Sequence, residues 1–232
     1  MILSFNIEYR TNWGEEVKLA GLSTESTPMY TTDGIYWTAE VELEVPQEGL
    51  TIHYSYQIEQ NGIVIRKEWN NFPRCLFLSG TPRKKYRIND CWKNIPEQLY
   101  LYSSAFTEAL LSHPEREDIP QGYKKGLIIK AYAPRINKDY CLAICGNQKA
   151  LGNWNPEKAV LMSDSNFPEW QVELDASKLK YPLEYKFILC HKQERKIDCW
   201  ERNPNRYLAD PEIKTNETLV ISDRYAYFDI PM

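Results

Sequence analysis

The chain has 232 residues, of which 43% are hydrophobic, and a formal net charge of −4. This length predicts one large domain or two of ordinary size, and the 16 Tyr and 7 Trp favour strands and flat binding faces. Because the balance is acidic and lacks the clustered Lys and Arg that phosphates require, we expect no nucleic-acid partner.

Residues 1–17 contain no apolar run long enough for a signal peptide, and no later window reaches the roughly 18 to 20 apolar residues of a membrane span. We therefore expect a soluble, cytoplasmic protein with no membrane partner. The six cysteines form no CxxC pair and are accompanied by only three histidines. This pattern favours reduced packing thiols, with zinc or disulfides as alternatives, and we predict no metal site and no cofactor.

The first 92 residues predict about seven short strands. Residues 3–9 alternate between apolar and polar side chains, which is the period of a half-buried strand. Asn61-Gly62 predicts a tight hairpin, since both residues tolerate positive φ. This spacing of short strands and turns is typical of a β-sandwich. The remaining expected strands are residues 17–21, 36–43, 50–58, 63–69, 75–78 and 85–92.

The pattern breaks after the seventh strand and then starts again. Prolines and a charged run after Asn94 predict an ordered linker with a short helix at 104–111. Beyond it, Trp37 is matched by Trp170 and Trp69 by Trp200, at separations of 133 and 131 residues. The sequence therefore predicts an all-β protein made of two immunoglobulin-like antiparallel β-sandwiches in tandem. The first copy is residues 1–93, the partly helical linker is 94–122, and the second copy is 123–232.

Two tryptophans of the second copy lie in polar surroundings. Trp154 follows Gly152-Asn153, and Trp200 precedes Glu201, so few apolar neighbours are available to bury either ring. A glucose ring presents C–H groups on its face and hydroxyls at its edge, which suits aromatic planes flanked by polar side chains. Trp37 and Trp170, by contrast, begin regular alternating strands and are expected in the core.

Polar side chains for the sugar hydroxyls are available nearby. Lys186 and Asn205 have the donors and acceptors that vicinal hydroxyls need. The alternatives are that Lys186 is a solvated strand lysine and that Asn203-Pro204-Asn205 is only a turn.

Together these motifs resemble the starch-binding domains of carbohydrate-binding module family 20. The matching residues are Leu151-Gly152-Asn153-Trp154, Trp170-x-Val-x-Leu174, Glu184-Tyr-Lys-Phe187 and Trp200-Glu201-x-Asn203-Pro204-Asn205-Arg206. The resemblance implies a non-catalytic sandwich that binds α-1,4-glucan such as starch, glycogen or maltooligosaccharide. At the family's first site it implies stacking on Trp154 and Trp200, and hydrogen bonds from Lys186 and Asn205 with Glu201 beside them.

The family's second site uses one aromatic before the second strand and another before the third. Trp13 and Tyr30 of the first copy stand at that spacing. In the second copy the two positions fall at about Lys138 and at Phe167, so that site is expected to be impaired. In the first copy the first site retains only Trp69, with Ser55 aligned to Lys186 and Arg74 aligned to Asn205. The resemblance thus implies sugar contacts at Trp13, Tyr30 and Trp69.

The tandem arrangement further resembles the N-terminus of the cytosolic 4-α-glucanotransferases of glycoside hydrolase family 77. This implies a parent enzyme whose catalytic domain follows Met232 and is targeted to polysaccharide by the two modules. Asp198 and Glu201 could be proposed as the acid pair of a glycoside hydrolase, but both fall in a hairpin at the edge of the expected sandwich and nothing marks a second acid in a cleft. Within the segment itself we therefore expect no catalytic residue. A competing interpretation is that the sandwiches are interaction modules for homodimerisation or for docking on the catalytic domain, with the first copy not binding sugar.

Overall fold

The computed structural model describes residues 1–69, 73–81, 84–94, 122–136, 138–192, 197–223 and 226–228, without the side chain of Asp198. The chain divides into two compact units: unit 1 is Met1–Glu97 with Asn216–Ser222, and unit 2 is Gln98–Thr215 with Asp223–Met232. Both are built from strands, which confirms the all-β prediction. The helix expected at residues 104–111 lies outside the described residues.

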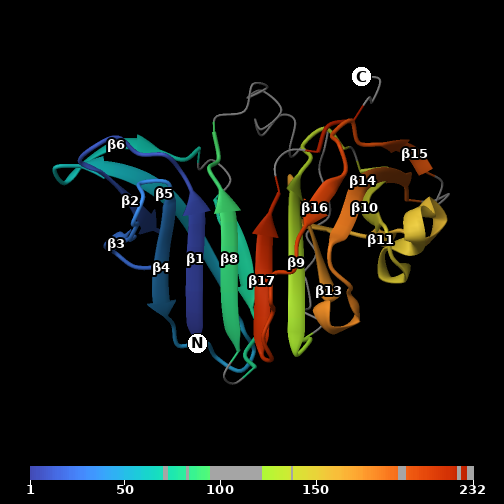
Figure 1. Ribbon diagram of the computed structural model, residues 1–232, viewed down its shortest axis with the longest axis horizontal. Helices are drawn as coiled ribbons and strands as arrows, with labels where there is room; N and C mark the ends of the chain where they lie inside the picture. Colours follow the sequence, from blue (N-terminus) through green and yellow to red (C-terminus); the bar gives the residue numbers. More distant parts are fainter. Residues whose placement is uncertain are drawn as a thin grey trace. The chain divides into compact units, whose positions relative to one another are not determined.

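The first sheet of unit 1 has a hydrophobic inner face. Strand β1 (Ile2–Glu8) pairs antiparallel with β4 (Tyr36–Glu42) and parallel with β8 (Lys85–Cys91), and the three lie side by side in Figure 1. Leu3, Phe5 and Ile7 are buried, as the alternating sequence predicts. The parallel pairing of β1 with β8 differs from the antiparallel sheets that we expected. The sequence pattern could not show this, because side chains alternate with a period of two in both kinds of sheet.

The second sheet of unit 1 is centred on β5. This strand (Leu50–Gln60) pairs with β2 (Glu15–Ala20), β6 (Ile63–Lys67) and β7 (Arg74–Leu78), and β3 (Thr27–Pro28) pairs with β2. Asn61 and Gly62 have φ of 52° and 75°, which confirms the predicted hairpin turn. The ring of Phe5 on β1 lies 5.1 Å from that of Tyr54 on β5. The two sheets of unit 1 therefore pack face to face.

One strand enters unit 1 from late in the chain. β17 (Glu217–Ser222) pairs parallel with β8, and the backbone N–H of Lys85 donates to the carbonyl of Asn216 at 2.8 Å. The sequence repeat assigns this strand to the second copy. Its contacts place Asn216–Ser222 in unit 1, whereas the next residue, Asp223, belongs to unit 2.

The described residues of unit 2 form two groups of paired strands and three short 3-10 helices. One group contains β9 (Lys125–Tyr132), β13 (Glu169–Asp175) and β12 (Ser163–Asn166). The other contains β10 (Tyr140–Gly146), β11 (Val160–Leu161), β14 (Leu183–His191), β15 (Ile197–Trp200) and β16 (Arg206–Leu208). The helices are η3 (Lys149–Trp154), η4 (Pro156–Lys158) and η5 (Ala176–Lys178). Trp170 is fully buried in unit 2 and Trp37 is buried in unit 1, which confirms both as core residues.

None of the six cysteines, all of which the structure describes, forms a disulfide. Within the described ranges, no helix combines the length and the apolarity that crossing a membrane requires. The same residues contain no group of three or more His, Cys, Asp or Glu side chains arranged to hold a metal ion.

Candidate functional site

The indole rings of Trp154 and Trp200 form a tilted pair in unit 2. Their centroids are 6.2 Å apart and their planes meet at 47°. Trp200 is 36% exposed and Trp154 is half-buried. Large aromatic side chains at the surface are unfavourable in water unless a ligand covers them, so the pair is a candidate binding face.

The turn that carries Trp154 has an unusual backbone. Gly152, Asn153 and Trp154 have φ of 83°, 52° and 59°, a region that non-glycine residues seldom adopt. A Cβ on Gly152 would lie 2.9 Å from the carbonyl oxygen of Lys158, so only glycine fits there. The side chain of Leu151 is fully buried and anchors the turn. The sequence run around Trp154 thus fixes a backbone conformation as well as supplying the ring.

Trp200 is held by the end of its strand. It is the last residue of β15 and stands opposite Ile188 of β14. The next residue, Glu201, closes the pairing twice: its backbone N–H donates to the carbonyl of Phe187 at 3.0 Å, and its carboxylate accepts the N–H of Phe187 at 2.8 Å. The carboxylate therefore replaces the backbone acceptor that β14 would otherwise need.

Arg206 pairs with the same carboxylate. Its Nε and Nη2 donate to the two oxygens of Glu201 at 3.1 and 2.8 Å, and its guanidinium lies 4.7 Å from the ring centre of Phe187. Nη1 forms an ion pair with Asp223 at 3.7 Å, and Tyr185 donates its hydroxyl to Asp223 at 2.6 Å. Burial raises the pKa of the Asp223 carboxyl above its ordinary value, although Arg206 and Tyr185 act in the opposite direction. Burial likewise raises the pKa of Tyr185.

Lys186 lies close to the tryptophan pair. It is on the same face of β14 as Ile188, the residue opposite Trp200, because side chains two apart share a face. Its Nζ donates to the backbone carbonyl of Glu201 at 3.2 Å, and an ammonium has three donors. Asn205 is exposed and directly precedes Arg206. The structure thus groups Trp154, Trp200 and Lys186, with Asn205 on the adjoining segment.

Glu201 is placed differently from the other predicted contacts. It is only 2% exposed, and both carboxylate oxygens are engaged by Phe187 and Arg206. Hydrolysis of a glycoside needs two carboxyl groups facing one substrate, and the engaged Glu201 does not offer one. Its contact with sugar stays a prediction.

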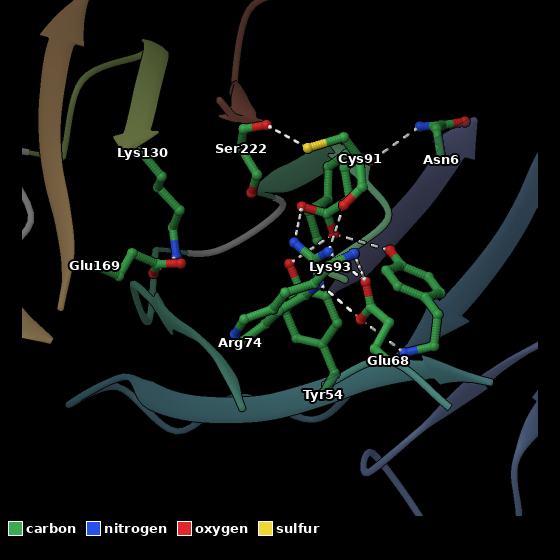
Figure 2. Close-up of polar contacts among 12 residues, drawn as sticks. Asn6, Tyr54, Glu68, Arg74, Cys91, Lys93, Lys130, Glu169 and Ser222 are labelled. Atoms are coloured by element: carbon green, nitrogen blue, oxygen red, sulfur yellow. Dashed lines mark hydrogen bonds and ion pairs between the residues drawn. The ribbon is translucent and has the colours of Figure 1, made fainter. Parts of the chain in front are cut away.

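Unit 1 contains the same buried arrangement (Figure 2). Arg74 donates to the carboxylate of Glu68 at 3.1 Å from Nε and 2.6 Å from Nη2, and to Asp90 at 3.0 Å from Nη1. Tyr54 donates to Asp90 at 3.0 Å, and the N–H of Tyr56 donates to Glu68 at 3.1 Å. The counterparts in the two units are Glu68 and Glu201, Arg74 and Arg206, Asp90 and Asp223, Tyr54 and Tyr185, and Tyr56 and Phe187.

This shared arrangement corrects the sequence alignment of the first site. Alignment on the tryptophans sets Trp69 against Trp200. The hydrogen bonds instead set Glu68 against Glu201, so Lys67, the residue before Glu68, takes the place of Trp200. The strand register agrees, with Cα partners Gln57 and Lys67 in unit 1 and Ile188 and Trp200 in unit 2. The residue aligned with Asn205, Arg74, is a buried member of the cluster.

Trp69 is packed within unit 1. It is 8% exposed, and its backbone N–H donates to the backbone carbonyl of Lys93 at 3.1 Å. The Nζ of Lys93 lies 5.9 Å from the centre of the Trp69 ring. Little of this ring is open to a ligand, and its predicted contact with sugar stays a prediction.

Trp13 and Tyr30 lie on two connected loops of unit 1. Trp13 is fully exposed and Tyr30 is 71% exposed. The segment before Trp13 is hydrogen-bonded to the loop after Tyr30, because the N–H of Thr11 donates to the carbonyl of Gly34 at 3.0 Å. The Asn12 N–H and side-chain amide hold the carboxylate of Glu15 at 2.8 and 3.0 Å, and the hydrogen bonds from Asn12 lower the pKa of Glu15. Trp13 therefore stands exposed on a braced turn.

The equivalent positions of unit 2 carry different side chains. Lys138 is exposed, and the half-exposed ring of Phe167 packs edge-on against Trp170 with centroids 6.2 Å apart. Neither position presents a free aromatic face like that of Trp13.

The buried clusters of the two units were not predicted from the sequence. The sequence does contain a repeated pattern for them, because a glutamate follows the second hairpin strand in each half of the chain. An arginine stands six residues after the glutamate in one half (Glu68, Arg74) and five residues after it in the other (Glu201, Arg206). The alignment of tryptophans obscured this signal.

Comparison with known proteins gives one family match. Residues 129–220 match the model of the family described as "Starch binding domain". The chain is also 23% identical over 247 residues to the 4-alpha-glucanotransferase DPE2 of Oryza sativa subsp. japonica, an alignment that covers 95% of this chain. The chain spans 25% of the length of that relative.

Two solved structures are also similar to parts of the chain. A glycoside hydrolase family 15 glucoamylase from Hypocrea jecorina is 23% identical with a TM-score of 0.37, over 48% of this chain and 19% of that one. The family 20 carbohydrate-binding module of the maltotetraose-forming amylase from Pseudomonas saccharophila STB07 is 18% identical with a TM-score of 0.34, over 42% of this chain and 99% of that one.

Proposed function

We propose that the starch-binding domain matched at residues 129–220 binds α-1,4-glucan on the tilted rings of Trp154 and Trp200. The observation that carries this proposal is the pair of tilted, partly exposed rings, with planes at 47°. Lys186 and Asn205 are proposed to donate to the hydroxyls at the edge of a stacked glucose. The hydrogen bond of Lys186 to the carbonyl of Glu201, next to Trp200, and the exposure of Asn205 support this. The polymers concerned are starch, glycogen and maltooligosaccharides.

The tilt of the rings favours a curved chain over a flat one. Successive glucose residues of an α-1,4-glucan turn relative to each other, so two inclined platforms can each stack on one sugar. Coplanar rings would instead suit the flat ribbon of cellulose. The contact is small and wet, so we expect modest affinity for a short oligosaccharide.

The chain as a whole is proposed to be two copies of one module. The repeated buried cluster supports a duplication, because five residues recur in the same roles in both units. In the first copy, Trp13 and Tyr30 are proposed as a second type of sugar contact, and their exposure supports it. Two linked modules on one polymer raise the effective affinity if the geometry lets both engage.

The biological role proposed for this binding is targeting. The similarity to a 4-alpha-glucanotransferase over 95% of this chain supports a non-catalytic segment that brings an attached transferase to its polysaccharide in the cytoplasm. The catalytic domain would follow Met232.

A second candidate function applies to the first copy. Lys67 occupies the place of Trp200, so the first type of site lacks a platform there. Strand β6 also exposes Ile63, Val64 and Ile65 along the edge of its sheet, and exposed edges of this kind pair readily with other chains. This observation favours an interaction module for dimerisation or docking. Analytical ultracentrifugation of wild type and Ile65→Lys tests the dimer. If both proteins sediment as monomers, dimerisation through this edge is refuted.

Affinity electrophoresis tests the main proposal. We expect a gel containing amylopectin to retard the wild type, and the double variant Trp154→Ala/Trp200→Ala to migrate faster. Tyr36→Ala, which removes an exposed aromatic side chain of unit 1 outside the proposed contacts, is the matched control and should migrate as wild type. A gel with soluble cellulose derivative should retard neither. A wild type that is not retarded by amylopectin would refute glucan binding.

A further inference from the structure

We infer that Arg206 is a positioning residue for the sugar-binding face, acting through Glu201 on both Trp200 and Lys186. The inference rests on the proposed function. Arg206 itself offers no stacking face at the site, since its side chain is 12% exposed and is paired with Glu201.

The first step concerns how β15 ends. The pairing of β14 with β15 stops at Ile188 and Trp200, and Phe187 would then have an unsatisfied backbone N–H. The carboxylate of Glu201 accepts that N–H at 2.8 Å while the N–H of Glu201 donates to the carbonyl of Phe187 at 3.0 Å. These two bonds hold Glu201 through its backbone N–H and through its side chain. The position of Glu201 in turn determines the position of the backbone of Trp200, to which the indole is attached.

The second step concerns Lys186. Its ammonium donates to the backbone carbonyl of Glu201 at 3.2 Å. The position of that carbonyl follows from the two hydrogen bonds between Glu201 and Phe187. A shift of Glu201 would therefore displace the charged head of Lys186 together with the ring of Trp200.

The third step concerns what holds Glu201. A carboxylate with one backbone partner can rotate, but Arg206 engages both oxygens through Nε and Nη2 at 3.1 and 2.8 Å. A bidentate guanidinium fixes the plane of a carboxylate, which a single ammonium cannot do. The guanidinium also lies on the ring of Phe187 at 4.7 Å, so Arg206 is itself held in place.

The corresponding cluster in unit 1 indicates what the arrangement does in general. There Arg74 engages Glu68 in the same bidentate manner, and Glu68 closes the pairing with Tyr56 by the same two bonds. The residue presented before the glutamate is Lys67 in unit 1 and Trp200 in unit 2. The arginine–glutamate pair that closes the strand pairing is therefore common to both units. In unit 2 the residue before the glutamate is an aromatic platform, whereas in unit 1 it is a lysine.

This relationship supplies a matched control. Arg206→Lys and Arg74→Lys make the same chemical change in corresponding clusters, one beside the proposed sugar face in unit 2 and one in unit 1. Both keep the positive charge among buried acids, so both variants are expected to fold with some loss of thermal stability. Only Arg206→Lys should disturb the site.

The experiment measures affinity and ring geometry together, on the full chain carrying Trp13→Ala so that maltoheptaose reports unit 2. Isothermal titration gives the dissociation constant. The far-ultraviolet circular dichroism couplet of the Trp154 and Trp200 rings, defined as the component lost in Trp200→Phe, reports their mutual orientation without ligand. All measurements are made well below the melting temperature of each variant.

We expect Arg206→Lys to weaken maltoheptaose binding about tenfold or more and to reduce the couplet, and Arg74→Lys to change neither. Unchanged affinity in Arg206→Lys, or weaker affinity with an unchanged couplet, would overturn the inference. Equal losses in Arg206→Lys and Arg74→Lys would also overturn it, because a general loss of stability would then explain both. If neither the Trp13→Ala chain nor the wild type binds maltoheptaose, the proposed function is refuted instead.

Discussion

The ring of Trp200 lies 6.2 Å from that of Trp154 although the two residues belong to different structural elements, the end of β15 and the turn of η3. Each ring is fixed by its own device, a buried carboxylate in one case and a run of positive φ angles in the other. The tilt between the rings is thus set by two independent backbone features, and each can be altered separately.

Replacing Trp200 by alanine should remove binding without unfolding the protein. Trp200 is 36% exposed, and changes at such positions alter the free energy of unfolding by about 0.5 kcal/mol or less when no buried feature is lost. Loss of one stacking platform should weaken maltoheptaose binding at least tenfold, or about 1.4 kcal/mol. Titration calorimetry and thermal unfolding measure the two quantities.

Trp170→Ala provides the contrasting case. The fully buried Trp170 should cost about 3–5 kcal/mol of stability when truncated. If Trp200→Ala destabilised the protein to that extent, Trp200 would be a packing residue and the platform assignment would be wrong.

Gly152→Ala tests the other ring. The residue has φ of 83°, and a Cβ would lie 2.9 Å from the backbone oxygen of Lys158. We expect a loss of about 1–2 kcal/mol from the positive φ alone, with a further loss from the close contact. Because the turn must move to relieve it, maltoheptaose affinity should fall as well.

The control for this change is Gly62→Ala in the hairpin of unit 1. Gly62 has φ of 75°, but a Cβ there would meet no atom within 4 Å. It should show the strain of positive φ without any effect on binding. Urea unfolding and calorimetry of both variants separate strain from displacement, and equal affinities for the two variants would contradict our account of the turn.

The sequence predicted the turn and the strands of this region for physical reasons that act locally. Gly152-Asn153-Trp154 was recognised as a polar turn from its residue types, and the positive φ of all three residues agrees with a turn there. The hairpin turn at Asn61-Gly62 was predicted because both residues tolerate positive φ. The strands around them follow from the alternation of buried and exposed side chains, as in Leu3, Phe5 and Ile7.

What the sequence did not predict depends on contacts between distant residues. The cluster of Arg206, Glu201 and Asp223 joins positions up to 22 residues apart, and single buried charges have no periodic pattern. The alignment of Trp69 with Trp200 failed because conspicuous side chains were matched instead of backbone register, which pairs Gln57 with Lys67 and Ile188 with Trp200. The partner of β17 was equally hidden, since strand pattern does not specify which strand lies alongside.

Asp223 should make the stability of unit 2 fall as the pH rises. Burial raises its pKa in the folded protein above the value in the unfolded chain, which is about 3.9 for an aspartate. The folded state then binds the proton more tightly, so the contribution is full below pH of about 4 and is lost as the pH rises through the folded pKa. Asp223→Asn keeps an acceptor for Tyr185 and removes this titration.

The difference in free energy of unfolding between wild type and Asp223→Asn isolates the effect from other carboxyl groups. We expect this difference to shift against the wild type as the pH rises above about 4 and through the folded pKa of Asp223, as measured by urea unfolding in a series of buffers. A difference that is independent of pH, or that shifts in favour of the wild type, would show that the ion pair with Arg206 outweighs burial.

Trp13→Ala should reduce binding to polysaccharide while leaving the fold intact. A fully exposed indole on a turn braced by Asn12 and Glu15 contributes little to packing, so the free energy of unfolding should change by about 0.5 kcal/mol or less. If Trp13 contacts glucan, its loss removes one of two linked attachments, and avidity for amylopectin should fall by more than affinity for maltoheptaose. Affinity electrophoresis and calorimetry compare the two, with Tyr36→Ala as the control for loss of an exposed aromatic side chain in unit 1. Retardation by amylopectin equal to wild type, together with an altered sedimentation coefficient, would assign Trp13 to a protein interface instead.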